Sequence, residues 1–108
     1  MIVSSSLQFL PDPITFIENL DGLDIPYLIF DKIPFFVEPN MQNRLMLQKV
    51  PPKIYDASYP VWIFGENLFI KEMIKNYELV DDFNAYNGYV EKIENSQMHY
   101  RGFIFKKK

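Results

Sequence analysis

Small polar side chains follow the first apolar run of the chain. Ser4, Ser5, Ser6 and Gln8 come directly after residues 1–3, a short β-branched stretch that is typical of a strand. In open α/β sheets, ligands bind at the carboxyl ends of the strands, so these hydroxyl and amide groups could face a cofactor or a substrate. The alternative is that the hydroxyls only satisfy amides of the following loop.

A carboxylate ends the next apolar run. Asp31 follows residues 26–30 and precedes Lys32. A carboxylate at the end of a strand could act as a general base or accept a hydrogen bond from a substrate hydroxyl. Asp31 is an equally good candidate for a turn residue.

A polar and aromatic set lies farther along the chain, within the proline-rich residues 33–64. Aromatic faces combined with hydrogen-bonding groups suit a sugar or another polar acceptor. The alternative is that the aromatic rings only seal this segment onto the rest of the fold. The candidate substrate-binding residues are Arg44, Gln48, Tyr55, Tyr59 and Trp62.

Composition excludes several other kinds of site. The chain has no cysteine and only one histidine, which excludes disulfides, thiolate metal sites and a histidine-rich metal cluster. The formal net charge of -3 argues against a nucleic-acid partner, because such proteins carry an excess of basic residues. We see no nucleophile–base pair, phosphate-binding loop or metal-ligand spacing.

The length and hydropathy predict one small domain, residues 1–108. Hydrophobic residues make up 48% of the chain, enough for a core. We find no signal-peptide pattern and no apolar stretch near the ~18 residues of a membrane span. The expected setting is a soluble, cytoplasmic domain without a membrane partner.

The first third of the chain predicts a strand–helix–strand unit. Asp12 is a good N-cap and Pro13 suits the first helical position, so a helix is expected over residues 13–21, ending near Gly22. The continuous apolar run at residues 26–31 predicts a strand buried on both faces, as in a parallel sheet. Together with residues 1–3, these elements form a βαβ unit.

The rest of the chain predicts an insert followed by a helix and two strands. Residues 33–64 have no helical period and contain one short alternating strand, over residues 44–50. A helix opens at residues 65–67, and strands are expected over residues 77–83 and 98–105, separated by the polar residues 84–97. The last two strands should form an antiparallel pair.

This order of elements resembles the C-terminal half of a class I S-adenosylmethionine-dependent methyltransferase, a Rossmann-like α/β fold. The chain is similar in particular to a bacterial methyltransferase family that often occurs in polysaccharide gene settings. The blocks that carry the likeness are SSSLQFLPDP (residues 4–13), YLIFDKIPF (27–35), RLMLQKVPPKIYDASYPVWIF (44–64), YELVDDFNAY (77–86) and YRGFIFKKK (100–108).

The resemblance implies a role for each candidate residue. Ser5, Ser6 and Gln8 would form the rim of the cofactor pocket and Asp31 would be the catalytic residue, with a small polar or saccharide-type acceptor. The glycine-rich turn that holds S-adenosylmethionine in this family is absent, since the four glycines are scattered. We therefore expect S-adenosylmethionine to be the cofactor of a full-length enzyme, and expect this chain alone to bind no cofactor and to be inactive.

The missing half also predicts a partner. In the family sheet, the fourth strand lies beside the first strand, which this chain lacks. Residues 1–5, from Met1 to Ser5, would then form an open edge with uncovered apolar surface. Such edges pair with other chains, so we expect a two-fold dimer through this edge, or pairing with the missing N-terminal half.

Overall fold

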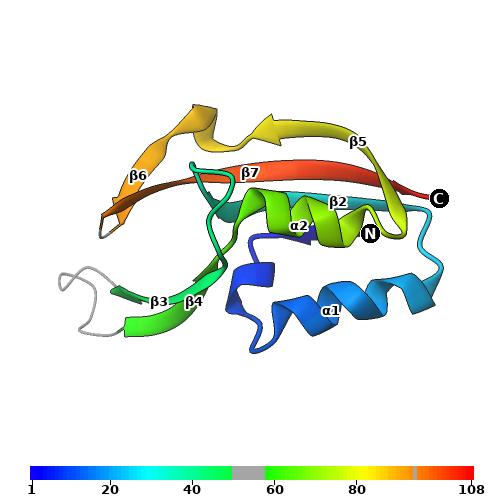
Figure 1. Ribbon diagram of the computed structural model, residues 1–108, viewed down its shortest axis with the longest axis horizontal. Helices are drawn as coiled ribbons and strands as arrows, with labels where there is room; N and C mark the ends of the chain where they lie inside the picture. The colour runs from blue at the N-terminus through cyan, green and yellow to red at the C-terminus, as the bar shows by residue number, and fades with distance from the viewer. Residues whose placement is uncertain (50–57, 94) are drawn as a thin grey trace.

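The computed structural model describes residues 1–49, 58–93 and 95–108. They form a mixed α/β fold in which a five-stranded mixed sheet, two α-helices and a separate two-stranded hairpin are arranged along a long axis (Figure 1). The predicted α/β class is confirmed at this level.

The five-stranded sheet has the strand order β1-β2-β7-β5, and β6 pairs with one end of β7. β1 runs parallel to β2, whereas β7 is antiparallel to β2, β5 and β6. The strand–helix–strand start and the antiparallel pairing of the last two predicted strands are therefore confirmed. The strands are β1 (Ile2–Ser4), β2 (Tyr27–Phe36), β5 (Tyr77–Asn84), β6 (Val90–Ile93) and β7 (Ser96–Lys107).

Helix α1 (Pro13–Asn19) begins where the cap residues predict. The carboxylate of Asp12 accepts hydrogen bonds from the Thr15 backbone N–H at 3.1 Å and from the Thr15 hydroxyl at 2.7 Å. These bonds satisfy donors that the first turn would otherwise leave unpaired. A 3₁₀ turn, η2 (Leu20–Leu23), continues the helix, so the helical segment is slightly longer than the expected residues 13–21.

Helix α2 (Glu66–Met73) supplies the centre of the core. The ring of Phe69 lies 5.1–6.0 Å, centroid to centroid, from the rings of Phe30, Phe35, Phe103 and Phe105. All five rings are buried, and three of the four pairs are edge-to-face, an arrangement that stabilises a core beyond its buried area. No helix within the described ranges has the length and apolar character needed to cross a membrane.

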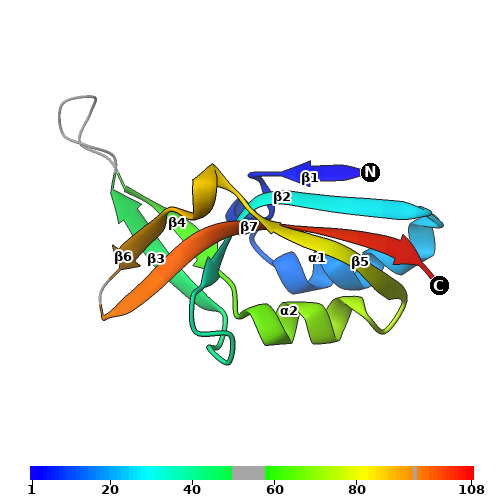
Figure 2. The same ribbon diagram turned by 90° about the horizontal axis from the view of Figure 1, so that it is seen from above.

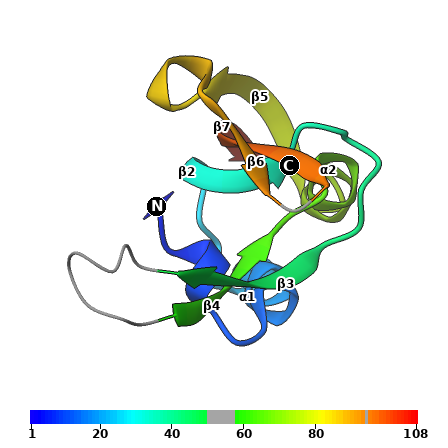
Figure 3. The same ribbon diagram turned by 90° about the vertical axis from the view of Figure 1, so that its left-hand side faces the viewer.

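Both helices lie on the same side of the sheet (Figures 2 and 3), and this corrects one expectation. Leu28 and Phe30 of β2 are fully buried beneath the helices, but Tyr27 is 50% exposed and Ile29 is only half-buried. The prediction that this run is buried on both faces is wrong, because no described element covers the second face. A parallel neighbour on one side of a strand does not require helices on both faces of the sheet.

Strand β2 also continues past Asp31 to Phe36 through a β-bulge, which corrects the expected strand end. Asp31 and Lys32 together lie opposite Gly102 of β7, and Lys32 has a positive φ of 57°. A Cβ on Gly102 would overlap the ring of Phe83 and lie 2.8 Å from the Phe30 carbonyl oxygen. The bulge therefore depends on glycine at this position of β7.

The predicted insert contains a hairpin of β3 (Arg44–Lys49) and β4 (Ser58–Ile63). Met46 and Ile63 are buried with Phe36 and Met98 in a second, smaller core, whereas Leu45 on the other face is 56% exposed. The alternation expected for the short strand at residues 44–50 is confirmed over its described residues. β4, β6 and the second half of β2 were not predicted.

Candidate ligand-binding groove

A groove separates the hairpin from the segment that follows β1. On one side lies the 3₁₀ turn η1 (Leu7–Phe9), which begins after the turn at Ser5, a residue with φ of 51°. On the other side lies the exposed face of the β3–β4 hairpin. The groove has a volume of about 210 Å³, and its lining residues are Gln8, Phe9, Leu10, Pro11, Leu45, Pro60 and Trp62.

The groove contains one buried polar side chain with an unpaired atom. Gln8 is only 3% exposed, and its Nε2 lies 3.5 Å from the Ser5 hydroxyl oxygen, to which it donates. Its Oε1 finds no hydrogen-bond donor among the described residues. A buried acceptor without a partner costs about 1–3 kcal/mol, and this carbonyl oxygen is itself buried rather than open to the groove.

The hairpin wall of the groove is apolar because of its strand register. Leu45 lies opposite Trp62, and Leu47 lies opposite Pro60. Directly opposed residues of an antiparallel pair project from the same face, so this face presents aliphatic, proline and indole surface toward η1. Trp62 is half-buried, and none of the seven lining residues carries a charge.

The structure separates the three expected cofactor-rim residues. Gln8 lines the groove, and Ser5 lies beside it and accepts its amide proton. Ser6 is exposed, its side chain makes no capping hydrogen bond, and its carbonyl accepts a hydrogen bond from the Phe9 amide at 3.1 Å. The partner that the Ser5 hydroxyl has in the structure is thus the side-chain amide of Gln8.

Asp31 lies outside the groove. It sits in the β2 bulge beside Ser4 of β1, and its backbone carbonyl accepts a hydrogen bond from the Ser5 amide at 2.9 Å. That bond fixes the turn leading to Gln8. The described geometry therefore gives the Asp31 backbone a positioning part in the site and does not bring its carboxylate to the groove.

Of the expected substrate-binding set, the structure places Trp62 in the groove. Arg44 is one residue from Leu45 on β3, so it projects from the opposite face of the hairpin. The backbones of Gln48 and Tyr59 are paired, but their side chains lie outside the description, as does the whole of Tyr55. Leu45 and Pro60, which sequence reasoning missed, carried no signal beyond their alternation with buried neighbours.

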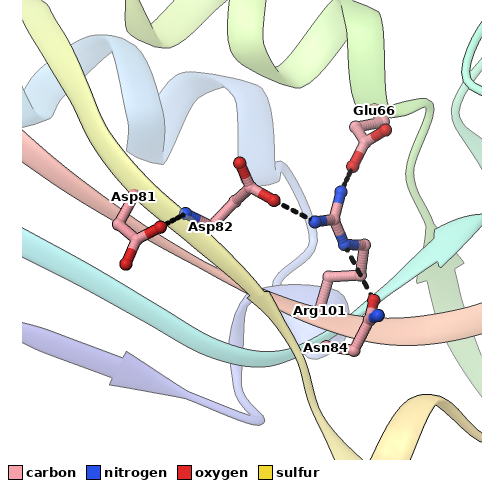
Figure 4. Close-up of polar contacts among 5 residues, drawn as sticks. All are labelled: Glu66, Asp81, Asp82, Asn84 and Arg101. Atoms are coloured by element: carbon pink, nitrogen blue, oxygen red, sulfur yellow. Dashed lines mark hydrogen bonds and ion pairs between the residues drawn. The ribbon is translucent and has the colours of Figure 1, made fainter.

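A second polar cluster lies at the N-terminus of α2 (Figure 4). The guanidinium group of Arg101 donates to Asn84 at 3.2 Å and forms ion pairs with Glu66 and Asp82. It also lies 5.2 Å from the centroid of the Phe103 ring. Burial lowers the pKa of Arg101. All three guanidinium nitrogens are engaged, so the cluster ties α2 to β5 and β7.

The glycines do not fit a complete S-adenosylmethionine site. Gly65 packs against the Met41 carbonyl, Gly102 packs against Phe83, and Gly88 has a positive φ of 75° in the turn after β5. Each has a local structural reason, and no two of them share a turn. Within the described parts of the chain, no cluster of histidine, aspartate and glutamate could hold a metal ion.

Among the buried side-chain polar atoms of the described residues, Oε1 of Gln8 is the one without a hydrogen-bond partner. The groove is therefore identified as a candidate binding site from its geometry alone. Comparisons of the chain with protein-family models, with curated proteins and with solved structures found no match.

Proposed function

We propose that this chain is the C-terminal part of an S-adenosylmethionine-dependent methyltransferase that acts on a small polar or saccharide-type acceptor, and that it is inactive alone. The order of its elements supports this proposal. A strand, a capped helix, a parallel strand, an insert, a helix and an antiparallel strand pair follow one another as the resemblance implies.

The observation that carries the proposal is the position of Gln8. Its side chain lines the groove just after the carboxyl end of β1, where open α/β sheets bind their ligands. S-adenosylmethionine would supply the methyl group, but the scattered glycines do not fit its cradle. We therefore assign to this chain the binding of the acceptor and the rim of the pocket, and no transfer step.

Calorimetric titration with S-adenosylmethionine tests the inactive-fragment part of the proposal. We expect no saturable heat up to about millimolar ligand, because no described turn brings backbone amides to the cofactor. Micromolar binding by the isolated chain would contradict it. The methyltransferase part is tested by the coding sequence upstream of Met1, where an in-frame glycine-rich segment after a predicted strand is expected. A stop codon there without such a segment would count against this part.

A second function, that of an assembly module, is favoured by the outer edge of β1. The carbonyl oxygen of Met1 and the backbone amide of Ser5 form hydrogen bonds with β2. Because backbone groups alternate in direction along a strand, those of Ile2 and Ser4 point away from the sheet. No described strand pairs with them, and the Ile2 side chain is 70% exposed. We propose that two copies pair through this edge about a two-fold axis near Val3.

Sedimentation at micromolar concentration tests the edge pairing. We expect a dimer for the wild-type chain and a monomer for Ile2→Lys, because a charge on an edge strand opposes pairing. The matched control is Leu47→Lys, since Leu47 is 71% exposed but lies on the hairpin; this variant should remain a dimer. A monomeric wild-type chain, or an unchanged Ile2→Lys dimer, would exclude this arrangement.

A further inference from the structure

We propose that a cavity between the segment after β2 and the start of β7 binds a primary alkylammonium group, either of a small amine or of a lysine side chain. The Glu38 carboxylate pairs with the cation. The cavity has a volume of about 520 Å³, and its lining residues include Val37, Glu38, Met41, Asn95, Ser96 and Gln97. It shares no lining residue with the groove beside η1, so the inference does not depend on the proposed function.

Backbone hydrogen bonds hold the walls of the cavity in place. The Val37 amide donates to the Gln97 carbonyl of β7 at 2.9 Å. Farther along the same wall, the Pro39 carbonyl accepts a hydrogen bond from the Asn67 amide of α2 at 3.0 Å. The cavity is therefore formed by backbone that is tied to both β7 and α2, and a ligand does not have to order these walls when it binds.

Glu38 supplies the negative charge. This residue is exposed, and its Oε1 accepts a hydrogen bond from the Asn40 backbone N–H at 3.1 Å. That bond orients the carboxylate but leaves lone pairs on both of its oxygens, since an ionised carboxylate has about four acceptor positions. Within the described part of the chain, no lysine or arginine forms an ion pair with Glu38. The carboxylate is thus held in position and still available to a cation.

The lining selects a ligand by its charge. The amide and hydroxyl groups of Asn95, Ser96 and Gln97 both donate and accept hydrogen bonds, so they suit ligands of either kind. Glu38 is the one ionisable residue among the described lining residues, and Lys92, which lies opposite Gln97 on β6, is not part of the lining. The cavity therefore favours a cation over an anion. Because Glu38 is solvated, the pair is weak, and we expect a dissociation constant of about 1 mM.

The apolar part of the lining favours an ammonium group carried on a methylene chain. Val37 is 38% exposed and Met41 is half-buried, so both side chains retain accessible surface. Stems of the lysine type pack their methylene groups on apolar surface while the charged end stays near water. The cavity volume also lies within the range of about 300–1,000 Å³ that is typical of small-molecule sites. An alkylammonium ligand therefore matches both the charge and the apolar surface of the lining.

Backbone amide NMR measures the binding and locates it. The chain is titrated with pentylamine and with Nα-acetyl-lysine methylamide at constant ionic strength and about pH 7, where both ammonium groups are charged. Saturable shifts are expected for the amides of residues 37–41 and 95–97. Equal affinities would show that the alkylammonium group alone is recognised, whereas tighter binding of the lysine compound would identify a lysine side chain of a peptide as the ligand.

Two further compounds test the role of charge. The Nε-acetylated form of the lysine compound has the same stem without the charge, and it should bind at least about fivefold more weakly. Pentanoate has a similar chain with a negative charge, and it should cause no saturable shift at these amides, because Glu38 repels it.

Three variants assign the binding to the cavity. Glu38→Gln keeps the size of the side chain and an oxygen that accepts the Asn40 N–H, so the fold should be retained while affinity falls about fivefold. Val37→Lys places a competing ammonium group on the wall and should weaken binding at least as much. Glu78→Gln is the matched control, because Glu78 is exposed on β5 and lies outside the cavity; this variant should bind like the wild type.

Any of four results would overturn the inference. Neither amine shifts the amides of residues 37–41 and 95–97 saturably, or the Nε-acetylated compound binds as tightly as the charged one. Alternatively, Glu38→Gln or Val37→Lys binds like the wild type with a dispersed, folded spectrum, or Glu78→Gln weakens binding as much as Glu38→Gln. Failure of the methyltransferase proposal is recognised separately, by cofactor calorimetry and by the upstream coding sequence.

Discussion

Replacing Gly65 with alanine is expected to lower the free energy of unfolding by about 3 kcal/mol, near the upper end of the cost of overpacking a core. The new Cβ would overlap the Met41 carbonyl oxygen, and Gly65 is buried. Its amide also donates to Asn43 Oδ1 at 2.8 Å. Because the obstructing atom belongs to the backbone, relief requires movement of the loop before β3 or of the start of α2. Chemical denaturation followed by circular dichroism measures the change.

Gly22→Ala is the matched control. A Cβ at Gly22 meets nothing within 4 Å, and the residue lies in the exposed turn after α1. This exchange should leave stability unchanged or raise it by up to ~0.5 kcal/mol, because alanine restricts the unfolded chain. If Gly65→Ala unfolds within about 0.5 kcal/mol of the wild type, the packing described between Met41 and Gly65 is wrong.

The second large effect is expected for Arg101→Met, which should cost about 2–3 kcal/mol. The exchange removes the cation that holds Glu66 and Asp82, and the Glu66 side chain, only 18% exposed, is left without its ion pair. Breaking a buried pair costs roughly 3–5 kcal/mol, and the 48% exposure of Asp82 lowers the expected figure here. Thermal or denaturant unfolding gives the value.

A double-mutant cycle isolates the ion pair within that cost. Glu66→Gln combined with Arg101→Met should be less destabilising than the sum of the single variants, because the second exchange removes a charge that the first left unpaired. Lys75→Met is the control, since Lys75 is 61% exposed in its pair with Glu72 and should cost at most ~0.5 kcal/mol. Strict additivity in the cycle would show that the Arg101–Glu66 contact contributes no coupling.

The elements with local signals were predictable from the sequence. Asp12 and Pro13 define the start of α1, because a cap and its first turn involve neighbouring residues. The apolar spacing of Phe69 and Met73 likewise defines the buried face of α2. Strands β5 and β7 were found from their own composition, and their antiparallel pairing follows from two consecutive predicted strands.

The elements that depend on distant partners were not predictable. β4 forms because it pairs with β3, although Pro60 lies in the middle of β4. A proline is tolerated there because β4 is an edge strand, which among the described strands pairs with β3 alone. The bulge at Lys32, which carries β2 past its expected end, depends on Gly102 seventy residues later in the chain. A run of apolar residues also does not show whether other elements will cover one face of the strand or both. For this reason the prediction that β2 is buried on both faces was wrong.

The candidate site was predictable in its residues but not in its arrangement. Gln8 and Trp62 were each identified from residue type, the first for a cofactor rim and the second for a substrate. Their meeting in one groove depends on the hairpin folding back over η1, which no local pattern encodes. Leu45 has no chemical group to attract attention. The strand that carries Asp31 continues to Phe36, beyond the end that the apolar run predicts.

The strand order has a consequence for the synthesis of the chain. β7 follows every other described strand in the sequence, yet it lies between β2 and β5 and also pairs with β6. While a ribosome is still translating residues 96–107, β2 and β5 have no neighbour between them, and the rings of Phe103 and Phe105 are missing from the core. The sheet can therefore close only after translation of this last strand, and until then the nascent chain exposes apolar strands to chaperones and to other chains.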